Sequence, residues 1–400
     1  MKSDVINETF ELVDGQCKRP MIRVVGVGGG GCNTVNQMVQ ADIQGVEFIS
    51  ANTDRDHLEK CLPVTQLQMG ATVTRGLGAG SNPKVGREAA EEDRDRIREM
   101  LEDTDLLFIT AGMGGGTGTG GAPVIAEIAQ ELGILTVAVV TKPFPHEGKK
   151  RMRIAEEGIR ELQQHADSLI VIPNEKLRLV LGGAVTLLSG FKAANDVLQN
   201  AVQGISDLIT RPGMINVDFA DVKTVMSNRG MAMMGLGAAE GEDRAQRAVD
   251  AALASPLLDD LELNGARGIL VNITCDESLT LDELEMISER IYEIASEEAE
   301  MKTGTSFDPS LNGELRVTVV ATGLDGGHAA HAAEAQQAME EAMPHPAVAQ
   351  FRANGVKDAR PNRQAPEPQQ PRPRLRQMSG SLALDQDIID IPAFLREQAD

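Results

Sequence analysis

The sequence predicts an α/β protein with a Rossmann-like domain built on a parallel sheet, a long central helix and a second, smaller α/β domain. Three observations predict this fold. Short apolar segments alternate with amphipathic segments from Met21 onward. Glycine-rich stretches follow two of the apolar segments, and residues 187–210 keep a helical period throughout. Strands that alternate with helices form parallel sheets with helices on both faces.

The first domain is expected to span residues 21–190, after a polar segment, residues 1–20, that we expect to be flexible. Its strands are predicted from short runs rich in valine, isoleucine and leucine. The expected strands are residues 21–27, 46–50, 105–111, 134–140 and 168–172. The expected helices are residues 31–43, 85–102, 121–132 and 149–165.

The longest predicted helix is residues 187–210. Its apolar residues recur with a period of about 3.6 for about six turns, which is typical of a helix buried along one side. The Arg-Pro-Gly sequence at 211–213 should end it, because proline cannot continue a helix. The second domain follows at residues 211–324. Its strands are expected at residues 267–274 and 314–321, with a helix at residues 281–298 between them.

The composition changes near residue 325. Residues 325–383 hold seven of the 18 prolines and seven glutamines, and almost no apolar clusters, which predicts a disordered linker. Apolar residues return in residues 384–400, and this segment is expected to be a short motif that becomes ordered on a partner protein. An ordinary tail docked on its own protein is the alternative. The apolar and proline residues of the motif are Ile388, Ile389, Ile391, Pro392, Phe394 and Leu395.

Charge and composition exclude several classes of protein. The net charge is −22, and a strongly acidic chain repels a nucleic-acid backbone. The sequence has no tryptophan and one tyrosine, so it lacks aromatic platforms for stacking on bases. The longest apolar run, residues 134–140, is shorter than the about 20 residues that span a bilayer, so we expect no direct membrane insertion. The four cysteines form no CxxC pair and show no metal-ligand spacing, which favours reduced thiols in a cytoplasm.

The first glycine-rich stretch is Gly26 to Asn33, GVGGGGCN. It follows a predicted strand, opens a predicted helix and fits the GxGxxG pattern of dinucleotide-binding loops. Glycines at such a position let the backbone approach a phosphate, and the helix N-terminus supplies free N–H groups and a partial positive charge. Taken alone, this stretch predicts a phosphate site only weakly.

A second stretch, residues 111–121, is a stronger indication. Its consecutive glycine amides can form an anion-binding nest, with Thr117 and Thr119 adding hydroxyl donors. Pro123 is expected in the first turn of the next helix, where its missing N–H does no harm. A flexible linker is the alternative, but a linker would not lie between a buried strand and a helix.

Two phosphate loops on neighbouring strands predict one polyphosphate held from two sides. A third glycine-rich stretch, residues 76–82, adds further amides. The sequence has no GxxxxGK[ST], so it lacks the P-loop lysine. Mg²⁺ and helix dipoles would then have to offset the phosphate charge. No side chain is predicted to hold a metal ion, and His328 and His331 fit a solvated tract better than a metal site.

With these motifs the chain resembles the FtsZ family of bacterial cell-division proteins, within the tubulin superfamily. The signature GGGTGTG occupies residues 114–120, and the resemblance runs almost without interruption from 21 to 324 and again over the last residues, DIIDIPAFLREQAD. Further matching stretches are GVGGGGCN, NTD at 52–54, RGLGAGSNP at 75–83, PFPHEGKKRMR at 143–153, NDVLQNAVQGISDLITRPG at 195–213 and NVDFADV at 216–222. The linker matches nothing, as is usual in this family.

The resemblance implies a GTP/GDP site with Mg²⁺ and assigns residues to it. Asp196 fits guanine, because a carboxylate can accept from the guanine N1–H and N2–H together, and adenine offers no such pair of donors. Without the resemblance, Glu147 and Arg151 are interpreted as an ordinary surface ion pair, because they are four residues apart. Phe191 is then interpreted as a core residue at the start of a buried helix. The implied nucleotide-binding residues are Gly28, Gly29, Gly30, Asn33, Gly114, Gly115, Gly116, Thr117, Gly118, Thr119, Gly120, Glu147, Arg151, Asn174, Phe191, Asn195 and Asp196.

The acidic loop 216–221 is implied to be catalytic, with Asp218 and Asp221 orienting water and Asn216 assisting. Without the resemblance, two loop acids more often make a solvated turn or a helix cap. Asp196 and Asp218 are 22 residues apart along a mostly helical path, about 33 Å at 1.5 Å per residue. If Asp196 contacts the base, Asp218 cannot reach the γ-phosphate of the same nucleotide, and the resemblance implies that it completes the site of the next subunit instead. A head-to-tail contact of this kind builds a filament.

The sequence therefore predicts a polymerising GTPase of cell division that works in the cytoplasm, at the division site on the inner face of the membrane. Its partners would be copies of itself and membrane-tethering adaptor and regulatory proteins that bind the last residues, with no nucleic acid.

Cys32 departs from the small residue usual in the family, and a residue that merely fits is favoured over a reactive thiol. A nicotinamide-dependent oxidoreductase is one alternative function, but it leaves GGGTGTG unexplained. A non-hydrolysing scaffold is another, but the presence of Asp218 and Asp221 argues against it.

Overall fold

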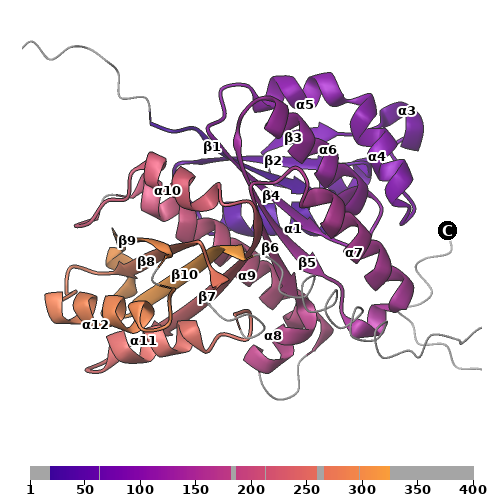
Figure 1. The fold of residues 1–400 in the computed structure, drawn as a ribbon. Coiled ribbons are helices and arrows are strands. Elements are labelled where there is room, and N and C mark those ends of the chain that lie inside the picture. The colour runs from indigo at the N-terminus through magenta and orange to yellow at the C-terminus, as the bar shows by residue number, and fades with distance from the viewer. Residues whose placement is uncertain are drawn as a thin grey trace, which may run out of the picture. The chain divides into compact units, whose positions relative to one another are not determined.

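The computed structural model contains a mixed α/β fold whose strands form a continuous sheet (Figure 1). The expected linker 325–383, the expected motif 384–400 and nearly all of the expected N-terminal segment lie outside the described residues. The structure describes residues 19–62, 64–181, 186–211, 213–258, 265–296 and 298–324.

Ten strands of the described chain make one sheet in the order β3-β2-β1-β4-β5-β6-β7-β10-β8-β9. From β3 to β7 every neighbouring pair is parallel. Strand β10 then pairs antiparallel with both β7 and β8, and β8 pairs parallel with β9. The strands are β1 (Ile22–Val27), β2 (Val46–Asn52), β3 (Thr65–Gln68), β4 (Leu106–Gly112), β5 (Leu135–Lys142), β6 (Ser168–Pro173), β7 (Gly230–Ala239), β8 (Gly268–Cys275), β9 (Glu300–Phe307) and β10 (Leu315–Leu324).

Helices cover both faces of the sheet, as the sequence predicts. One core cluster joins α1 (Gly28–Gln40), α9 (Leu187–Thr210) and α10 (Phe219–Met226) to strands from β1 to β10. A second lies on the opposite face of β1, β4 and β5 and takes in α4 to α7. These are α4 (Pro83–Glu92), α5 (Arg94–Leu101), α6 (Thr117–Glu131) and α7 (Lys149–Leu162). A third cluster packs α11 (Arg244–Leu253) and α12 (Leu281–Tyr292) on β8 and β10.

The remaining elements are short. They are α2 (Arg55–Glu59), α3 (Ala71–Thr74), α8 (Asn174–Leu181) and the 3₁₀ turns η1 (Pro145–Glu147) and η3 (Pro309–Leu311). Within the described residues, no helix combines the length and the apolar character needed to cross a membrane.

The central helix has the predicted bounds, and its ends follow from local chemistry. The Thr186 hydroxyl accepts from the Ser189 N–H and caps the first turn of α9. At the other end, Arg211 adopts extended backbone with φ −96° and ψ 132°. A residue that precedes proline avoids the helical region, so the sequence itself ends the helix at Thr210.

The predicted helix 85–102 is two helices, α4 and α5, and this is a correction. The break falls at Asp93, whose backbone leaves the helical region with φ −103° and ψ 20°. Its carboxylate accepts from the Gly70 N–H at 2.7 Å. The helical period continues through the break, so periodicity alone does not reveal it.

The position expected for Pro123 is also wrong. Helix α6 begins at Thr117, inside the glycine run, so Pro123 is an interior residue rather than part of the first turn. Glycine is a poor helix former, which made the sequence predict a later start. Close packing overrides this propensity, because a Cβ at Gly120 would lie 2.0 Å from the Pro83 carbonyl oxygen.

Candidate nucleotide site

The first glycine loop joins β1 to α1. Gly28 has φ +72°, which favours glycine, and a Cβ there would lie 2.9 Å from the Gly118 nitrogen. The first loop therefore touches the second one directly. Gly29, Gly30 and Asn33 are exposed on the first turns of α1, and a Cβ at Gly29 would meet only the His57 ring, at 3.8 Å. The backbone of Gly29 is thus accessible to a ligand.

The second loop connects β4 to α6 and is held in shape by two threonines. The Thr119 hydroxyl accepts from the Gly114 N–H at 2.8 Å, and the Thr117 and Thr53 hydroxyl oxygens lie 2.6 Å apart. Gly114 has φ +96°. Both threonine side chains are buried, so they order the loop from inside instead of presenting free hydroxyls.

The glycines of the second loop divide into two groups. A Cβ at Gly115 would meet nothing within 4 Å, so this residue faces open space. A Cβ at Gly116 would lie 2.8 Å from the Ala79 Cβ, and one at Gly118 would lie 3.0 Å from the Gly112 oxygen. Gly116, Gly118 and Gly120 therefore allow close packing between segments. The contact of Gly116 with Ala79 also brings the third glycine-rich stretch against the second loop.

The residues expected around the base lie on α8 and α9 and face the two loops. Asn195 accepts from the Thr34 hydroxyl at 3.1 Å, and Asp196 accepts from the Gln37 amide nitrogen. Both donors lie on α1, so the contacts tie α9 to the helix that carries the first loop. Phe191 is 42 % exposed.

Asn174 is the one group among the expected base-side residues that is buried without a partner. It is 5 % exposed, and its Oδ1 has no hydrogen-bond partner among the described residues. Leaving such an oxygen unpaired is unfavourable by about 1–3 kcal/mol. It lines a cavity of 110 Å³ together with Gly30, Thr34, Gly112, Met113, Thr141, Pro143, Glu147, Arg151, Phe191, Ala194, Asn195 and Leu198.

Glu147 and Arg151 form the ion pair that their spacing predicts, with 2.9 Å between Oε2 and Nη1. The other carboxylate oxygen of Glu147 accepts from the Phe144 N–H at 2.8 Å. A Cβ at Gly114 would lie 2.8 Å from the Arg151 Cγ. The pair is therefore not remote from the loops: it borders the cavity, with Arg151 packed on the second loop.

The acidic segment lies at the opposite end of α9. The Asn216 side-chain oxygen accepts from the Gly213 N–H at 2.9 Å, and Asp221 pairs with Lys302 at 3.0 Å. Asp218 precedes the first residue of α10 but makes no side-chain capping bond. A cavity of 610 Å³ contains Asn216 and Asp218, and it shares no lining residue with the cavity at Asn174. From Asp196 to Thr210 the helix rises about 21 Å at 1.5 Å per residue.

Arg211, which directly follows α9, forms ion pairs with two carboxylates. Arg211 lies 2.9 Å from Asp207 and 3.1 Å from Asp308. Asp207 is 3 % exposed, and burial raises its pKa to about 6 against the attraction of Arg211. Desolvation of the buried carboxylate is thus a larger effect than its interaction with Arg211.

Cys32 is fully buried in α1, and burial raises the pKa of its thiol above the ordinary value. A helix N-terminus can lower a thiol pKa, but desolvation is the larger effect here. The thiol is therefore protonated at neutral pH in the protein as described. This argues against a reactive thiolate at Cys32 in the metal-free protein.

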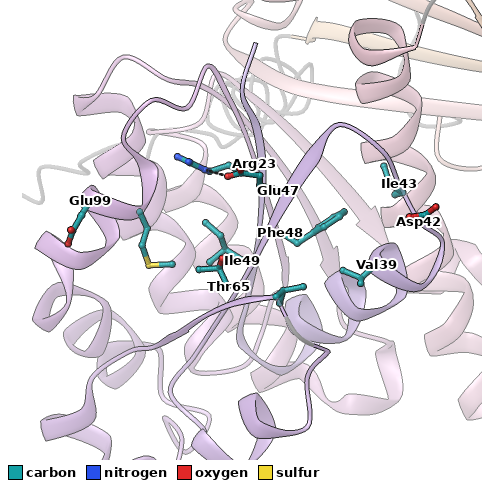
Figure 2. A pocket seen from close by; sticks show the side chains of 11 residues that line it. Arg23, Val39, Asp42, Ile43, Glu47, Phe48, Ile49, Thr65 and Glu99 are labelled. Carbon is teal, nitrogen blue, oxygen red and sulfur yellow. Dashed lines mark hydrogen bonds and ion pairs between the residues drawn. The ribbon is translucent and has the colours of Figure 1, made fainter. Parts of the chain in front are cut away.

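The largest of these cavities is elsewhere. It has a volume of 860 Å³ and contains none of the predicted site residues. Figure 2 shows that the Arg23–Glu47 ion pair lies in it, next to the aliphatic Ile49, with Glu99 on another wall. An open hollow lined by paired charges and aliphatic groups presents no phosphate cradle, so volume alone does not locate the functional site.

Sequence reasoning missed several residues that build the nucleotide site. Thr34 and Gln37 hold the base-side residues, Thr53 pairs with Thr117, and Phe144 lies edge-on to Phe191 with ring centroids 5.5 Å apart. The spacing of Thr34 and Gln37 after the first loop places them on α1, and this was an available signal. Their partners are more than 150 residues away, so the contacts were not predictable from spacing.

Two family models match this chain. The model described as "Tubulin/FtsZ family, GTPase domain" matches residues 21–182. The model described as "FtsZ family, C-terminal domain" matches residues 230–325. Together they take in both glycine loops and the region that follows the acidic segment.

Individual proteins are similar over nearly the whole chain. A cell division protein FtsZ of Pseudomonas putida is 54% identical over 98% of this chain and 100% of its own length. One of Coxiella burnetii is 54% identical over 97% of this chain and 98% of its own length. Among solved structures, an empty FtsZ dimer of M. jannaschii is 46% identical, with a TM-score of 0.74 over 78% of this chain and 90% of that one.

Proposed function

This chain belongs to the FtsZ family, and we propose that the two ends of α9 are two halves of one GTPase site, completed between neighbouring subunits. The protein is a GTP-binding GTPase of cell division that associates with copies of itself. This membership overturns the alternative of a nicotinamide-dependent oxidoreductase. The roles of individual residues are our proposal and are argued below from their contacts.

One observation carries the proposal for binding: two glycine loops touch, and each has a glycine at which a Cβ would meet no close contact. The contact is at Gly28 and Gly118, and the open positions are Gly29 and Gly115. Each loop opens a helix, α1 of 13 residues and α6 of 15, whose first N–H groups have no helical partner. Amides of this kind hold phosphate oxygens without a lysine. We assign the phosphates of GTP to the space between Gly29 and Gly115.

The base would lie beside α8 and α9. Asn174 offers an unpaired buried oxygen, and an amine donor of the base would satisfy it. Asp196 has one oxygen bonded to Gln37 and one without a partner among the described residues, which suits a guanine donor. Phe191 lies at the mouth of the cavity and is exposed enough to contact the ring. The cavity of 110 Å³ is smaller than a nucleotide, so the phosphates would lie outside it over the loops.

Mg²⁺ fits this site as a partner of the phosphates. The loops supply amides and no cation comparable to a P-loop lysine, and Arg151 is paired with Glu147. Bound Mg²⁺ would neutralise phosphate charge and favour transfer of the γ-phosphoryl group to water. No carboxylate of the two loops is assigned to the ion, which would be held mainly by phosphate oxygens.

The acidic segment would act on the GTP of another subunit. Asp218 and Asp221 are separated from the base-side residues by the lower part of α9, about 21 Å of helix. Lys302 pairs with Asp221, and the Gly213 N–H donates to Asn216, so residues outside the two glycine loops hold the segment in place. We assign Asp218 and Asp221 to orienting the attacking water, with Asn216 fixing the turn. A head-to-tail contact then completes each site and extends a filament.

Mixing two inactive variants tests the shared site. Asp221→Ala should bind GTP but lose most hydrolysis, by about 10²- to 10³-fold. Gly115→Asp should lose GTP binding, because a carboxylate fits the open space there and repels the phosphates. In an equal mixture, up to about a quarter of random head-to-tail contacts pair an intact GTP site with an intact acidic segment. We expect GTP turnover to return in the mixture, measured as phosphate release per subunit.

The control for Gly115→Asp is Gly265→Asp. Gly265 also has open space around a Cβ and no strained backbone, and it precedes β8, outside the two glycine loops. This variant should bind and hydrolyse GTP normally. If mixtures of the two inactive proteins stay inactive while both still pellet with wild-type filaments, the site is not shared between subunits.

The last residues would connect the filament to the membrane. We propose that residues 384–400 bind adaptor and regulatory proteins through Ile388, Ile389, Ile391, Pro392, Phe394 and Leu395. Residues 325–383 would act as a tether, and the filament would assemble in the cytoplasm at the division site, on the inner face of the membrane. Deleting 384–400 should leave GTP-dependent sedimentation unchanged and abolish co-sedimentation of adaptors. Adaptor binding that survives the deletion would contradict this role.

A further inference from the structure

Three potential metal ligands come together beneath the first glycine loop. They are the Cys32 thiol, the His57 ring and the Cys61 thiol, and their ligand atoms all lie within 4.8 Å of one another. Cys32 lies in α1, His57 lies in α2, and Cys61 follows α2 by two residues. The sequence shows no CxxC pair, because the cluster combines one close pair with a cysteine 29 residues away.

The close pair is held by one short helix. His57 and Cys61 are four residues apart, a spacing that places side chains on one face of a helical turn. The turn continues past α2, because the Cys61 N–H donates to the Leu58 oxygen at 3.0 Å. The Asp54 carboxylate caps the start of α2 by accepting from the His57 N–H at 3.1 Å. The Cys61 thiol also donates to the His57 carbonyl oxygen at 3.4 Å. The backbone and this bond hold both side chains in place, and the imidazole is not used.

The third ligand comes from the sheet side. The Cys32 Sγ lies 3.7 Å from both the Gly26 and Ala51 oxygens, at the carboxyl ends of β1 and β2. The Ser50 hydroxyl lies beside this thiol, is fully buried and has no other partner among the described residues. His57 and Cys61 are half-buried. One side of the cluster is therefore buried in the protein, and the other is accessible to solvent.

We propose that Cys32, His57 and Cys61 bind a thiophilic divalent metal ion, of which Zn²⁺ is the best match. Two thiolates and one imidazole are soft and borderline ligands, which favour Zn²⁺ over Mg²⁺ or Ca²⁺. The sulfur and nitrogen ligands of one Zn²⁺ lie close together, and these three ligand atoms, all within 4.8 Å of one another, are compatible with one ion. The two thiol protons leave to solvent as the ion binds. Water supplies the fourth ligand from the open side.

The ion would lie next to the nucleotide site. A Cβ at Gly29 would lie 3.8 Å from the His57 ring, and Cys32 belongs to the helix that carries the first loop. Binding of His57 to the ion would fix the ring that borders Gly29. Metal and GTP should therefore change each other's affinity by the same factor. This coupling rests on the proposed GTP site, whereas the metal site itself does not.

Cobalt substitution tests the metal site directly. The full-length protein, reduced, nucleotide-free and freed of metal, is titrated with Co²⁺. We expect one ion per chain, with the visible absorption of tetrahedral Co²⁺, a thiolate-to-cobalt charge-transfer band, and displacement by one equivalent of Zn²⁺. A spectrum without thiolate bands, or binding of Mg²⁺ with equal affinity, would overturn the proposal.

Variants identify the ligands. Cys61→Ser and His57→Ala change half-buried side chains, so they should preserve the fold, as circular dichroism can check. Each should weaken Co²⁺ binding by more than about 100-fold, the upper range for loss of an outer-shell partner. The matched control is Cys275→Ser, a buried thiol on β8, which should leave the titration unchanged. If Cys61→Ser binds Co²⁺ like the wild type, these residues do not form a metal site.

A last measurement separates this proposal from the GTP site. GTP affinity is compared with and without one equivalent of Zn²⁺, in the wild type and in Cys61→Ser. A change of several-fold in the wild type alone supports coupling through Gly29. If Co²⁺ binds stoichiometrically but Zn²⁺ does not change the GTP affinity, the metal site is retained and the coupling is rejected. If the wild type binds the metal ion but does not bind GTP, only the assignment of the GTP site is contradicted.

Discussion

Helix α9 has a different polar environment at each end. Beside its first turns, Asn174 of α8 keeps a buried oxygen that has no partner in the described part of the chain, and Phe191 of α9 is partly exposed in the same cavity. At its last turns, Arg211 contacts two carboxylates, Asp207 and Asp308. One end is built to be completed by a small molecule. The other is braced internally and presents an acidic surface outward.

This difference shows how one helix can serve two subunits. A ligand site benefits from polar groups that are held in place but unsatisfied, because the ligand then replaces water at little loss of order. A segment that must fit a site on another chain benefits from a fixed shape before contact. The hydrophobic side of α9, which is buried in the first core cluster, holds the two ends at a constant separation.

The nucleotide end should fail when the contact between its two loops is disturbed. Gly28→Ala places a Cβ 2.9 Å from the Gly118 nitrogen, so the loops must separate. We expect GTP affinity to fall by about 10- to 100-fold, because small displacements of positioning groups have effects of this size. Titration with a fluorescent GTP analogue measures the loss.

Gly133→Ala is the matched control, because Gly133 has nearly the same φ, +73°, and nothing within 4 Å of a Cβ. Both substitutions introduce a left-handed alanine, unfavourable by about 1–2 kcal/mol. Gly28→Ala adds to this shared loss the loss from separating the loops, and only Gly28→Ala should lower affinity. Equal affinities in the two variants would mean that contact between the loops does not matter for binding.

Asp207, at the last turns of α9, should make the free energy of unfolding depend on pH. Burial raises the pKa of Asp207 from its ordinary 3.8 to about 6. The folded protein thus holds this proton more tightly than the unfolded chain does. The contribution of Asp207 to stability is fully present below about pH 4 and is lost as the pH rises through 6. At 1.36 kcal/mol per unit of pKa, the loss amounts to about 2–3 kcal/mol.

Asp207→Asn should abolish this dependence, because asparagine cannot ionise. We expect the stability of the wild type relative to Asp207→Asn to fall between pH 4 and pH 7, measured by urea denaturation. Other carboxylates titrate in the same range, so the difference between the two proteins is the informative quantity. Parallel pH profiles would mean that Arg211 keeps Asp207 ionised throughout.

Much of the parallel half of the fold follows from the sequence. Strands β1, β4, β5 and β6 and the bounds of α9 were predictable because apolar runs and a long helical period are strong local signals. Strand β7 was not, because its sequence, GMAMMGLGAA, is poor in the residues that favour strands. Its glycines instead let α11 approach, and a Cβ at Gly237 would lie 2.0 Å from the Ala248 oxygen.

The candidate site was predictable where its chemistry belongs to the backbone. Glycine runs after strands identify the two loops, since few other local patterns place free amides together. The packing roles of Gly118 and Gly120 and the contacts of Gln37 with Asp196 depend on segments distant in the chain. The same applies to the cluster of Cys32, His57 and Cys61, for which only the four-residue spacing of the last two is visible in the sequence.

The smallest effect is expected at the edge of the nucleotide end. Phe191 is 42 % exposed and lies edge-on to Phe144, so only part of its ring can contact a base. Stacking on a base contributes about 1–3 kcal/mol, and leucine keeps part of the apolar contact, so Phe191→Leu should weaken GTP binding by about fivefold. Leu188→Ala is the control, because Leu188 is an exposed apolar residue of the same helix that does not line the cavity. Calorimetric titration should find the loss only in Phe191→Leu; an equal loss in both variants would mean that α9 acts on the site through its general stability and not through this ring.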